Sequence, residues 1–244
     1  MINLIKFTLI SAVTTLLCSC SITDGGNNKS PESLYRVAES LQKSGDHATS
    51  ARLYHQILLA NPEFEPAIKG LGTSLRQTNQ SNEAINFFED KLKQNSSSAV
   101  YLEELGKSYI AANMAQEGMK TYKSLLAISP TNTAAMNGLG VCLDMESQHT
   151  EAQSWYKKAL QDNSNNSNVK SNLGLSLALS GTPKEGIALL LPLSKEQNPS
   201  ANVQHNLAIA YALDGQAAKA EEIFSQELSS SEVKTNLATL KSLK

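Results

Sequence analysis

The stretch MNGLGVCLDMESQHTEAQSWYKKAL, residues 136 to 160, holds the pattern that decides the fold. The pair Leu139-Gly140 is followed twelve residues later by the small Ala152, and four residues after that by the large Tyr156. Small residues at two such positions let two helix backbones approach closely, while the large residue fills the space beside them. The stretch therefore predicts a pair of antiparallel helices.

The same spacing recurs every 34 residues in both directions along the chain. The Leu-Gly pair is found again at residues 71, 105 and 173, with Leu-Ala at 207 and Val-Ala at 37. The second small residue is Ser50, Ala84, Gly118, Ala152, Gly186 or Ala220, and the large residue is Tyr54, Phe88, Tyr122, Tyr156, Leu190 or Phe224. Self-similarity at a fixed period of this length indicates an array of repeats.

This register resembles the tetratricopeptide repeat, whose 34-residue unit carries W-x2-L-G-x2-Y followed by A, F and P. Leading tryptophans are absent here, and closing prolines occur only at Pro62 and Pro130. One helical hairpin cannot bury its apolar face alone, so neighbouring hairpins must stack. The resemblance implies an all-α, right-handed solenoid of six repeats, each with a helix A and a helix B, over residues 31–234.

A further helix over residues 229–244 is expected to close the array, because terminal units of repeat proteins are atypical. Ser229 and Glu232 have the spacing of a capping box. Val233, Leu237 and Leu240 lie on one stripe of this helix. Within the repeats, Gly45, Asn113 and Gly215 mark turns between helices A and B, so the loops should be short.

The amino-terminal segment predicts a lipid anchor. Lys6 is followed by an apolar run over residues 7–17, which is too short to span a bilayer and is typical of a secretory signal. The segment ends in Leu17-Cys18-Ser19-Cys20 and resembles the lipobox of bacterial lipoproteins. Residues 1–19 are thus expected to be removed and Cys20 to carry diacylglyceryl and N-acyl groups, while an ordinary signal peptide remains the alternative.

Residues 20–30 then form a polar tether rich in glycine, asparagine and serine. Serine after the lipidated cysteine resembles the outer-membrane sorting pattern of two-membraned bacteria. We therefore expect the protein to be anchored to the outer membrane by lipid alone, with its body in the periplasm.

Composition argues against several classes of function. The formal net charge is −2, and −3 once Lys6 is removed, which offers no electrostatic footprint for nucleic acid. The sequence contains no His-Glu-x-x-His, Gly-x-Ser-x-Gly, P-loop or Cys-x-x-Cys motif, so no catalytic residue, metal site, cofactor or small-molecule substrate is predicted. Cys142 aligns with Ser or Ala in the other repeats and is interpreted as a small packing residue rather than a reactive thiol. The protein is therefore expected not to be an enzyme.

The class of function that remains after these exclusions is binding of another protein. In the tetratricopeptide family the A helices line the concave face, and one A-helix position changes here from Glu39, Thr73 and Lys107 to Val141, Leu175 and Ile209. An apolar stripe with polar flanks suits an amphipathic helix or an apolar peptide. The alternative, that these side chains pack between adjacent A helices or under the last helix, stays open. The predicted groove comprises Asn137, Val141, Ser171, Leu175, Ala178, His205, Ile209 and Ala212.

The C-terminal third of the sequence resembles one particular group of tetratricopeptide-repeat proteins. Residues 171–193 and 204–244, with Asn-Leu-Gly, Leu-Pro-Leu and a closing Val-Lys-Thr-Asn-Leu-Ala, are similar to the TadD-type lipoproteins of Flp (tight-adherence) pilus assembly. This resemblance implies a scaffold that binds other pilus or secretion proteins and supports the outer-membrane secretin. A pilotin or adaptor for a type IV pilus or type II secretion system is the alternative. The carboxylate clamp of chaperone-binding relatives is not expected, because its positions hold Tyr35, Glu39, Gly70, Val100 and Glu104.

Overall fold

The computed structural model describes residues 30–242, which form thirteen α-helices. The predicted anchor Cys20 and residues 21–29 of its tether lie outside these residues. The A helices are α1 (Pro31–Lys43), α3 (Glu65–Gln77), α5 (Ala99–Ala111), α7 (Thr133–Met145), α9 (Ser167–Leu179) and α11 (Ala201–Leu213). The B helices are α2 (His47–Ala60), α4 (Ser81–Gln94), α6 (Ala115–Ile128), α8 (His149–Asp162), α10 (Pro183–Leu193) and α12 (Ala217–Phe224), and α13 (Ser230–Ser242) follows them.

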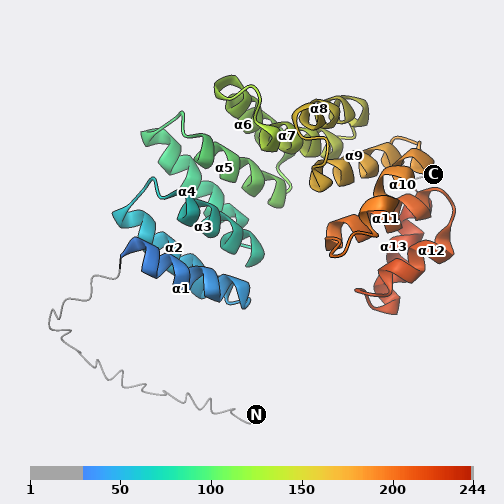
Figure 1. Ribbon diagram of the computed structural model, residues 1–244, viewed down its shortest axis with the longest axis horizontal. Helices are drawn as coiled ribbons and strands as arrows, with labels where there is room; N and C mark the ends of the chain where they lie inside the picture. Colours follow the sequence, from blue (N-terminus) through green and yellow to red (C-terminus); the bar gives the residue numbers. More distant parts are fainter. Residues whose placement is uncertain (1–29, 243–244) are drawn as a thin grey trace, which may run out of the picture.

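The helices form two layers that follow an arch (Figure 1). Each A helix packs on the next A helix along the whole array, whereas among residues 30–242 no Cα atom of one B helix lies within 8 Å of a Cα atom of another. In Figure 1, α6, α8 and α12 lie on the outer side of the arch, and α7, α9 and α11 lie on the inner side. The predicted helical hairpins are confirmed, and the A helices supply the inner surface.

The core consists of the small and large residues that recur every 34 positions. All six second small residues, from Ser50 to Ala220, are buried, and so are all six large residues, from Tyr54 to Phe224. A Cβ atom added to Gly106 would lie 2.5 Å from Cζ of Tyr122, and one added to Gly118 would lie 2.7 Å from Sγ of Cys142. The small residues are therefore required because a side chain of the neighbouring helix occupies the space that a larger side chain would need.

Local capping chemistry places the helix ends at the same register in every repeat. Side-chain oxygens of Ser or Asn cap five of the six A helices, as Asn132 does for α7, and Ser30 with Pro31 begins α1. Each A–B turn contains one residue with positive φ, and these residues are Gly45, Asn79, Asn113, Ser147, Gly181 and Gly215. Glycine and asparagine enter this left-handed region at the lowest cost, which explains their recurrence at the helix ends.

The array is modified at its C-terminal end. The first four B helices contain 14 residues, but α10 contains 11 and includes Pro192, and α12 contains only 8. The chain then turns into α13, which packs on α11 and α12. Ser229 and Glu232 form the predicted capping box, since the Ser229 amide donates to Oε2 of Glu232 at 2.8 Å. Val233 of α13 is buried in the same cluster as Tyr211 and Phe224, so this helix covers the apolar end of the last repeat.

Candidate protein-binding groove

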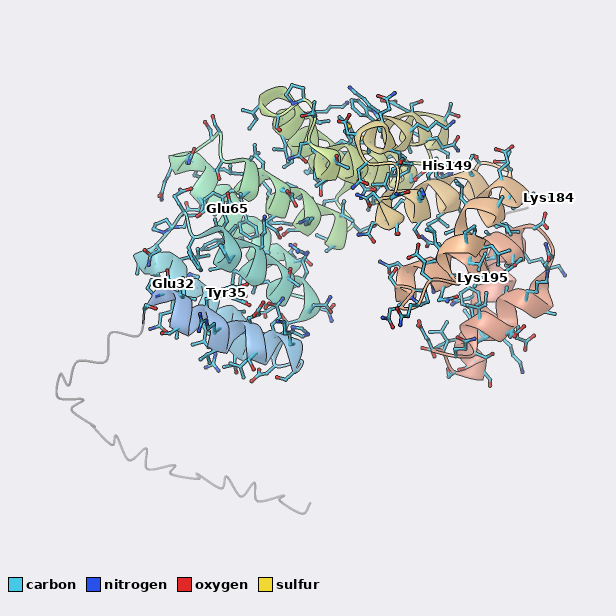
Figure 2. All side chains as sticks on the ribbon, in the orientation of Figure 1. Glu32, Tyr35, Glu65, His149, Lys184 and Lys195 are labelled. Carbon is cyan, nitrogen blue, oxygen red and sulfur yellow. The ribbon has the colours of Figure 1, made fainter. Side chains whose placement is uncertain are left out.

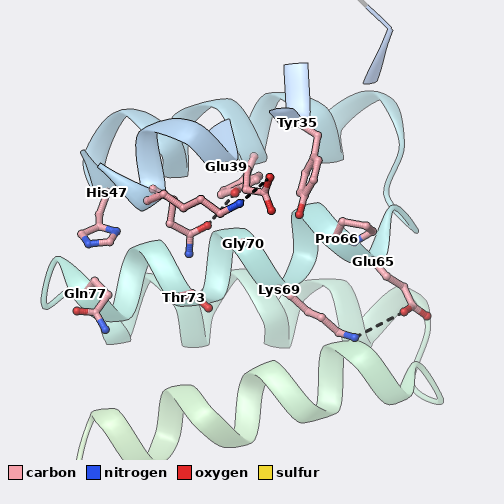
Figure 3. Close-up of a pocket in the computed structure, with 12 residues that line it drawn as sticks. Tyr35, Glu39, His47, Glu65, Pro66, Lys69, Gly70, Thr73 and Gln77 are labelled. Atoms are coloured by element: carbon pink, nitrogen blue, oxygen red, sulfur yellow. Dashed lines mark hydrogen bonds and ion pairs between the residues drawn. The ribbon is translucent and has the colours of Figure 1, made fainter. Parts of the chain in front are cut away.

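The inner surface is built from matching positions of successive A helices. At its N-terminal end, α1 and α3 enclose a hollow of about 680 Å³ lined by Tyr35 and Glu39 on one side and Lys69 and Thr73 on the other. Figure 3 shows the α1 side chains pointing across this hollow toward α3. Tyr54 reaches it from α2 and donates a hydrogen bond to Oε1 of Gln42 at 2.7 Å. The first third of the groove is therefore polar and mixed in charge.

Ion pairs within the protein already neutralise the charges of this polar part. Lys43 pairs with Glu39 at 3.2 Å, and Lys69 pairs with Glu65 at 3.8 Å (Figure 3). Both pairs are exposed and join residues one helical turn apart, so each contributes little to stability. An incoming charged segment would have to compete with these pairs for the same side chains.

Further along the inner surface, a buried carboxylate lies between α3 and α5. Glu104 is 1% exposed, and its Oε2 accepts from Nη1 of Arg76 at 2.9 Å while its Oε1 accepts from Nζ of Lys107 at 2.8 Å. Burial acts to lower the pKa of Lys107, but the neighbouring carboxylates Glu104 and Glu103 outweigh it, and the pKa is raised. The network keeps Lys107 charged and joins two repeats through side chains that are 28 residues apart.

Asp144 is a second polar hub, located where α7, α8 and α9 meet. Its Oδ1 accepts from Oγ of Ser176 at 2.7 Å and lies 2.8 Å from Nδ1 of His149, and its Oδ2 accepts from the hydroxyl of Tyr156 at 2.8 Å. His149 lies in the first turn of α8, beside α9 (Figure 2). Asp144 thus ties its own helix hairpin to the next repeat.

A ladder of amide hydrogen bonds joins the last three A helices. Nδ2 of Asn172 donates to Oδ1 of Asn137 at 2.9 Å, and Nδ2 of Asn206 donates to Oγ of Ser171 at 3.0 Å. Each bond links one A helix to the next at residues 35 apart. The polar groups of Asn137 and Ser171 are therefore used in hydrogen bonds between A helices.

The predicted groove residues differ in exposure. Val141, Leu175 and Ile209 are partly buried, and Val141 and Ile209 also pack against the core. Ser171, Ala178 and Ala212 are buried, so they can offer a partner almost no surface. Asn137 is partly buried, and His205 is exposed with its ring 5.2 Å from the ring of Phe224.

Sequence reasoning missed a second apolar row, which lies four residues, or about one helical turn, beyond Val141, Leu175 and Ile209. Met145, Leu179 and Leu213 are partly buried at equivalent positions of α7, α9 and α11. Leu179 and Leu213 line a hollow of about 530 Å³ that ends at Asp144 and His149. A search for the 34-residue period at this position could have found the row, because the first repeats hold Lys43 and Gln77 there.

The arrangement of these polar residues does not support catalysis. Ser176 is buried and donates to Asp144 instead of to a ring nitrogen of His149, so the cluster lacks a serine–histidine pair. Burial raises the pKa of the Cys142 thiol to about 12, which keeps it protonated and unreactive. Within residues 30–242, no group of His, Cys, Asp and Glu is arranged to hold a metal ion. No helix in that range is long and apolar enough to cross a bilayer.

Comparison with known proteins identifies the fold. No family model matches the chain, and no curated protein does. Among solved structures, a tetratricopeptide repeat protein from Parabacteroides merdae superimposes with a TM-score of 0.70, at 13% identity over 88% of this chain and 86% of that chain.

Two further solved structures are similar, and one of them is described as a pilus biogenesis factor. PilW, described as a widely conserved type IV pilus biogenesis factor, gives a TM-score of 0.65 at 18% identity over 87% of this chain and 99% of its own. PilF of Pseudomonas aeruginosa gives a TM-score of 0.58 at 13% identity over 80% and 89%. At these identities the likeness concerns the fold. The chain therefore has the tetratricopeptide-repeat fold, with about six helical hairpins and a closing helix.

Proposed function

We propose that this protein is a non-enzymatic scaffold that binds an apolar or amphipathic segment of a pilus-assembly protein on the inner face of repeats 4 to 6. The observation that carries the proposal is the row Val141, Leu175 and Ile209, which is partly exposed on three successive A helices. The row Met145, Leu179 and Leu213 widens it. An apolar strip on a concave surface suits the face of an amphipathic helix.

The remainder of the inner face supports the same assignment. In repeats 1 to 3 the basic side chains Lys43, Lys69, Arg76 and Lys107 already pair with carboxylates of the protein. A charged ligand would gain little there, because it would exchange one ion pair for another. The apolar strip has no such competing partner, so burial of apolar surface favours docking at repeats 4 to 6.

We assign the machine to the Flp (tight-adherence) pilus and the partner to its outer-membrane secretin. The resemblance of residues 171–193 and 204–244 to TadD-type lipoproteins supports this assignment. In this proposal Cys20 is lipidated, the anchor holds the protein at the outer membrane, and the solenoid faces the periplasm. The fold shared with PilW favours a second candidate, an adaptor lipoprotein of a type IV pilus.

A binding experiment with purified secretins tests the site and the machine together. The double variant Leu175→Glu, Ile209→Glu should lose capture of the Flp-type secretin, because binding would bury unpaired carboxylates. Thr73→Glu, at the same A-helix position in repeat 2, should retain capture. If the double variant unfolds, the strip is part of the core and not a docking site. If it folds and still captures the secretin, the site lies in the polar half around Glu39 and Lys69.

The choice of secretin offered as bait distinguishes the two candidate machines. Capture of the secretin of a type IV pilus, and not of the Flp-type secretin, would replace the first assignment by the second. Binding of neither secretin to the wild-type protein would refute both.

The anchor is tested by metabolic labelling with radioactive palmitate. Cys20→Ser should abolish the label, whereas the neighbouring Cys18→Ser should be labelled like the wild-type chain. Label that persists in the Cys20 variant would show that the lipidation site is elsewhere.

A further inference from the structure

The outer face of repeats 1 and 2 carries a hollow of about 720 Å³ that the proposed function does not use. It lies between the B helices α2 and α4, and its floor includes Leu71 and Leu75 of α3. Lys69 and Thr73, which line the inner groove, are each two residues before these leucines. Two residues correspond to about 200° around a helix with 3.6 residues per turn, so the hollow and the groove are on opposite faces of α3.

The hollow exists because repeat 2 is packed differently from the other repeats. In the other hairpins helix A packs at least as closely on its own B helix as on the preceding one, but α3 packs far more closely on α2 than on α4. Within residues 30–242, no Cα of α2 lies within 8 Å of a Cα of α4. The two outer helices therefore leave the buried side chains Ala51, Leu71 and Leu75 as an apolar floor.

Opposite charges face each other across this hollow without pairing. Arg52 on the α2 side donates to Oγ1 of Thr49 at 3.1 Å, and Glu83 on the α4 side accepts from Nε2 of Gln80 at 2.7 Å. Asp90, further along α4, pairs only with Lys93 of its own helix at 3.5 Å. Among the described residues, no ion pair joins α2 to α4. A ligand with an acidic and a basic side could contact both walls.

The length of the hollow and its aromatic wall define the shape of such a ligand. The lining residues run from Ala48 to His55 on α2 and from Glu83 to Asp90 on α4, and seven residues of helix rise about 10.5 Å. The ring of Phe87 lies 5.6 Å from the ring of His55 and forms one end of the apolar surface. The length therefore corresponds to two turns of helix.

We propose that this hollow is a second docking site, which receives two turns of an amphipathic α-helix from another protein. The apolar stripe of that helix faces Ala48 and Phe87, above the buried Leu71 and Leu75, its acidic flank faces Arg52, and its basic flank faces Glu83 and Asp90. Because the inner groove is on the other side of α3, the protein can hold two partners at once and act as an adaptor. This proposal is independent of the partner of the inner groove.

A synthetic peptide provides the probe. The mixed peptide is a 14-residue amphipathic helix with leucines on one stripe, glutamates on one flank and lysines on the other, and the basic peptide has lysines on both flanks. Binding is measured by fluorescence anisotropy on the full lipidated chain in phosphatidylcholine nanodiscs, with empty nanodiscs as the blank. We expect the mixed peptide to bind more tightly than the basic peptide, and Arg52→Glu to reverse this preference because both walls then become acidic.

A blocking variant with a matched control locates the binding. Ala48 is exposed and lines the hollow, so Ala48→Trp should fill it and weaken binding of the mixed peptide at least tenfold. Ala218 is exposed at the same register position of α12, and Ala218→Trp should leave binding unchanged. Equal binding by the two variants, no binding by the wild-type chain, or no change of preference in Arg52→Glu would each overturn the proposal. If the variant Leu175→Glu, Ile209→Glu lost binding of the mixed peptide while Ala48→Trp retained it, the peptide would lie in the inner groove.

Discussion

The ring of Tyr156 lies over the backbone of Gly140, so that a Cβ atom on Gly140 would stand 2.5 Å from Cε1 of the ring. Gly140→Ala should therefore destabilise the protein by about 1–3 kcal/mol, because the buried ring has no room to move aside. This sign is opposite to the usual gain when alanine replaces glycine inside a helix. Urea unfolding measures the change.

Lys157→Ala on the exposed face of α8 serves as the control and should change stability by less than about 0.5 kcal/mol. A stabilised Gly140→Ala variant would show that the two helices are not in the close contact described.

Ser147 occupies a backbone position that favours glycine. Its φ is +59°, and the equivalent residues of repeats 1, 5 and 6 are Gly45, Gly181 and Gly215. Ser147→Gly should stabilise the protein by about 0.5–1 kcal/mol, because relief of the left-handed strain exceeds the added freedom of the unfolded chain. The melting temperature reports the change. Ser154→Gly, inside α8, should lower it, and a loss of stability in both variants would contradict the turn geometry.

The ion pair of Arg76 with Glu104 should matter more than an exposed pair, because Glu104 is 1% exposed. Arg76→Met should cost about 1–3 kcal/mol, since it leaves the buried carboxylate with Lys107 as its remaining cationic partner. Adding Glu104→Gln to Arg76→Met should restore part of the loss, because no buried charge then remains. Urea unfolding of the single and double variants tests this, and a neutral Arg76→Met would show that the carboxylate is solvated.

The stability of the protein should fall in alkaline solution. Burial is the main cause that raises the pKa of six tyrosines above their ordinary value of 10.0, with Tyr101 at about 12. They are Tyr35, Tyr54, Tyr101, Tyr109, Tyr122 and Tyr156. The folded state thus holds protons that the unfolded state releases from about pH 10 upward. Their stabilising effect is complete below that pH and is lost as the pH rises through the folded pKa values. Thermal melts from pH 8 to pH 11 should show the decline, and a flat profile would contradict it.

Cys142 should be inert in the folded protein. It is buried at the helix crossing beside Gly118, and burial raises its pKa to about 12. In a chain with Cys18→Ser and Cys20→Ser, Cys142 is the only thiol, so alkylation by iodoacetamide reports on it alone. At pH 8 the native protein should react far more slowly than the urea-unfolded protein. Equal rates would show that the thiol is accessible.

Much of the fold follows from local spacing. A helix places residues four apart on one face, so a small residue at 140 and a large one at 156 already specify which surfaces can meet. The turns at Gly45, Asn113 and Gly215 and the capping box at Ser229 are decided by backbone preferences within a few residues. These features were predictable because each depends on neighbours in the chain.

The candidate sites were less predictable, because they depend on contacts between repeats. Sequence alone established the period, the burial of its small and large residues, and the change from a polar to an apolar inner face. Only the tertiary structure decided that Ser171, Ala178 and Ala212 are buried, that Asp144 bonds to Ser176, and that α3 packs less closely on α4 than on α2. The spacing of residues along a helix determines the face of the helix on which each side chain lies. How far that face is covered depends on the angle and distance of the next helix, which the sum of all packing contacts determines.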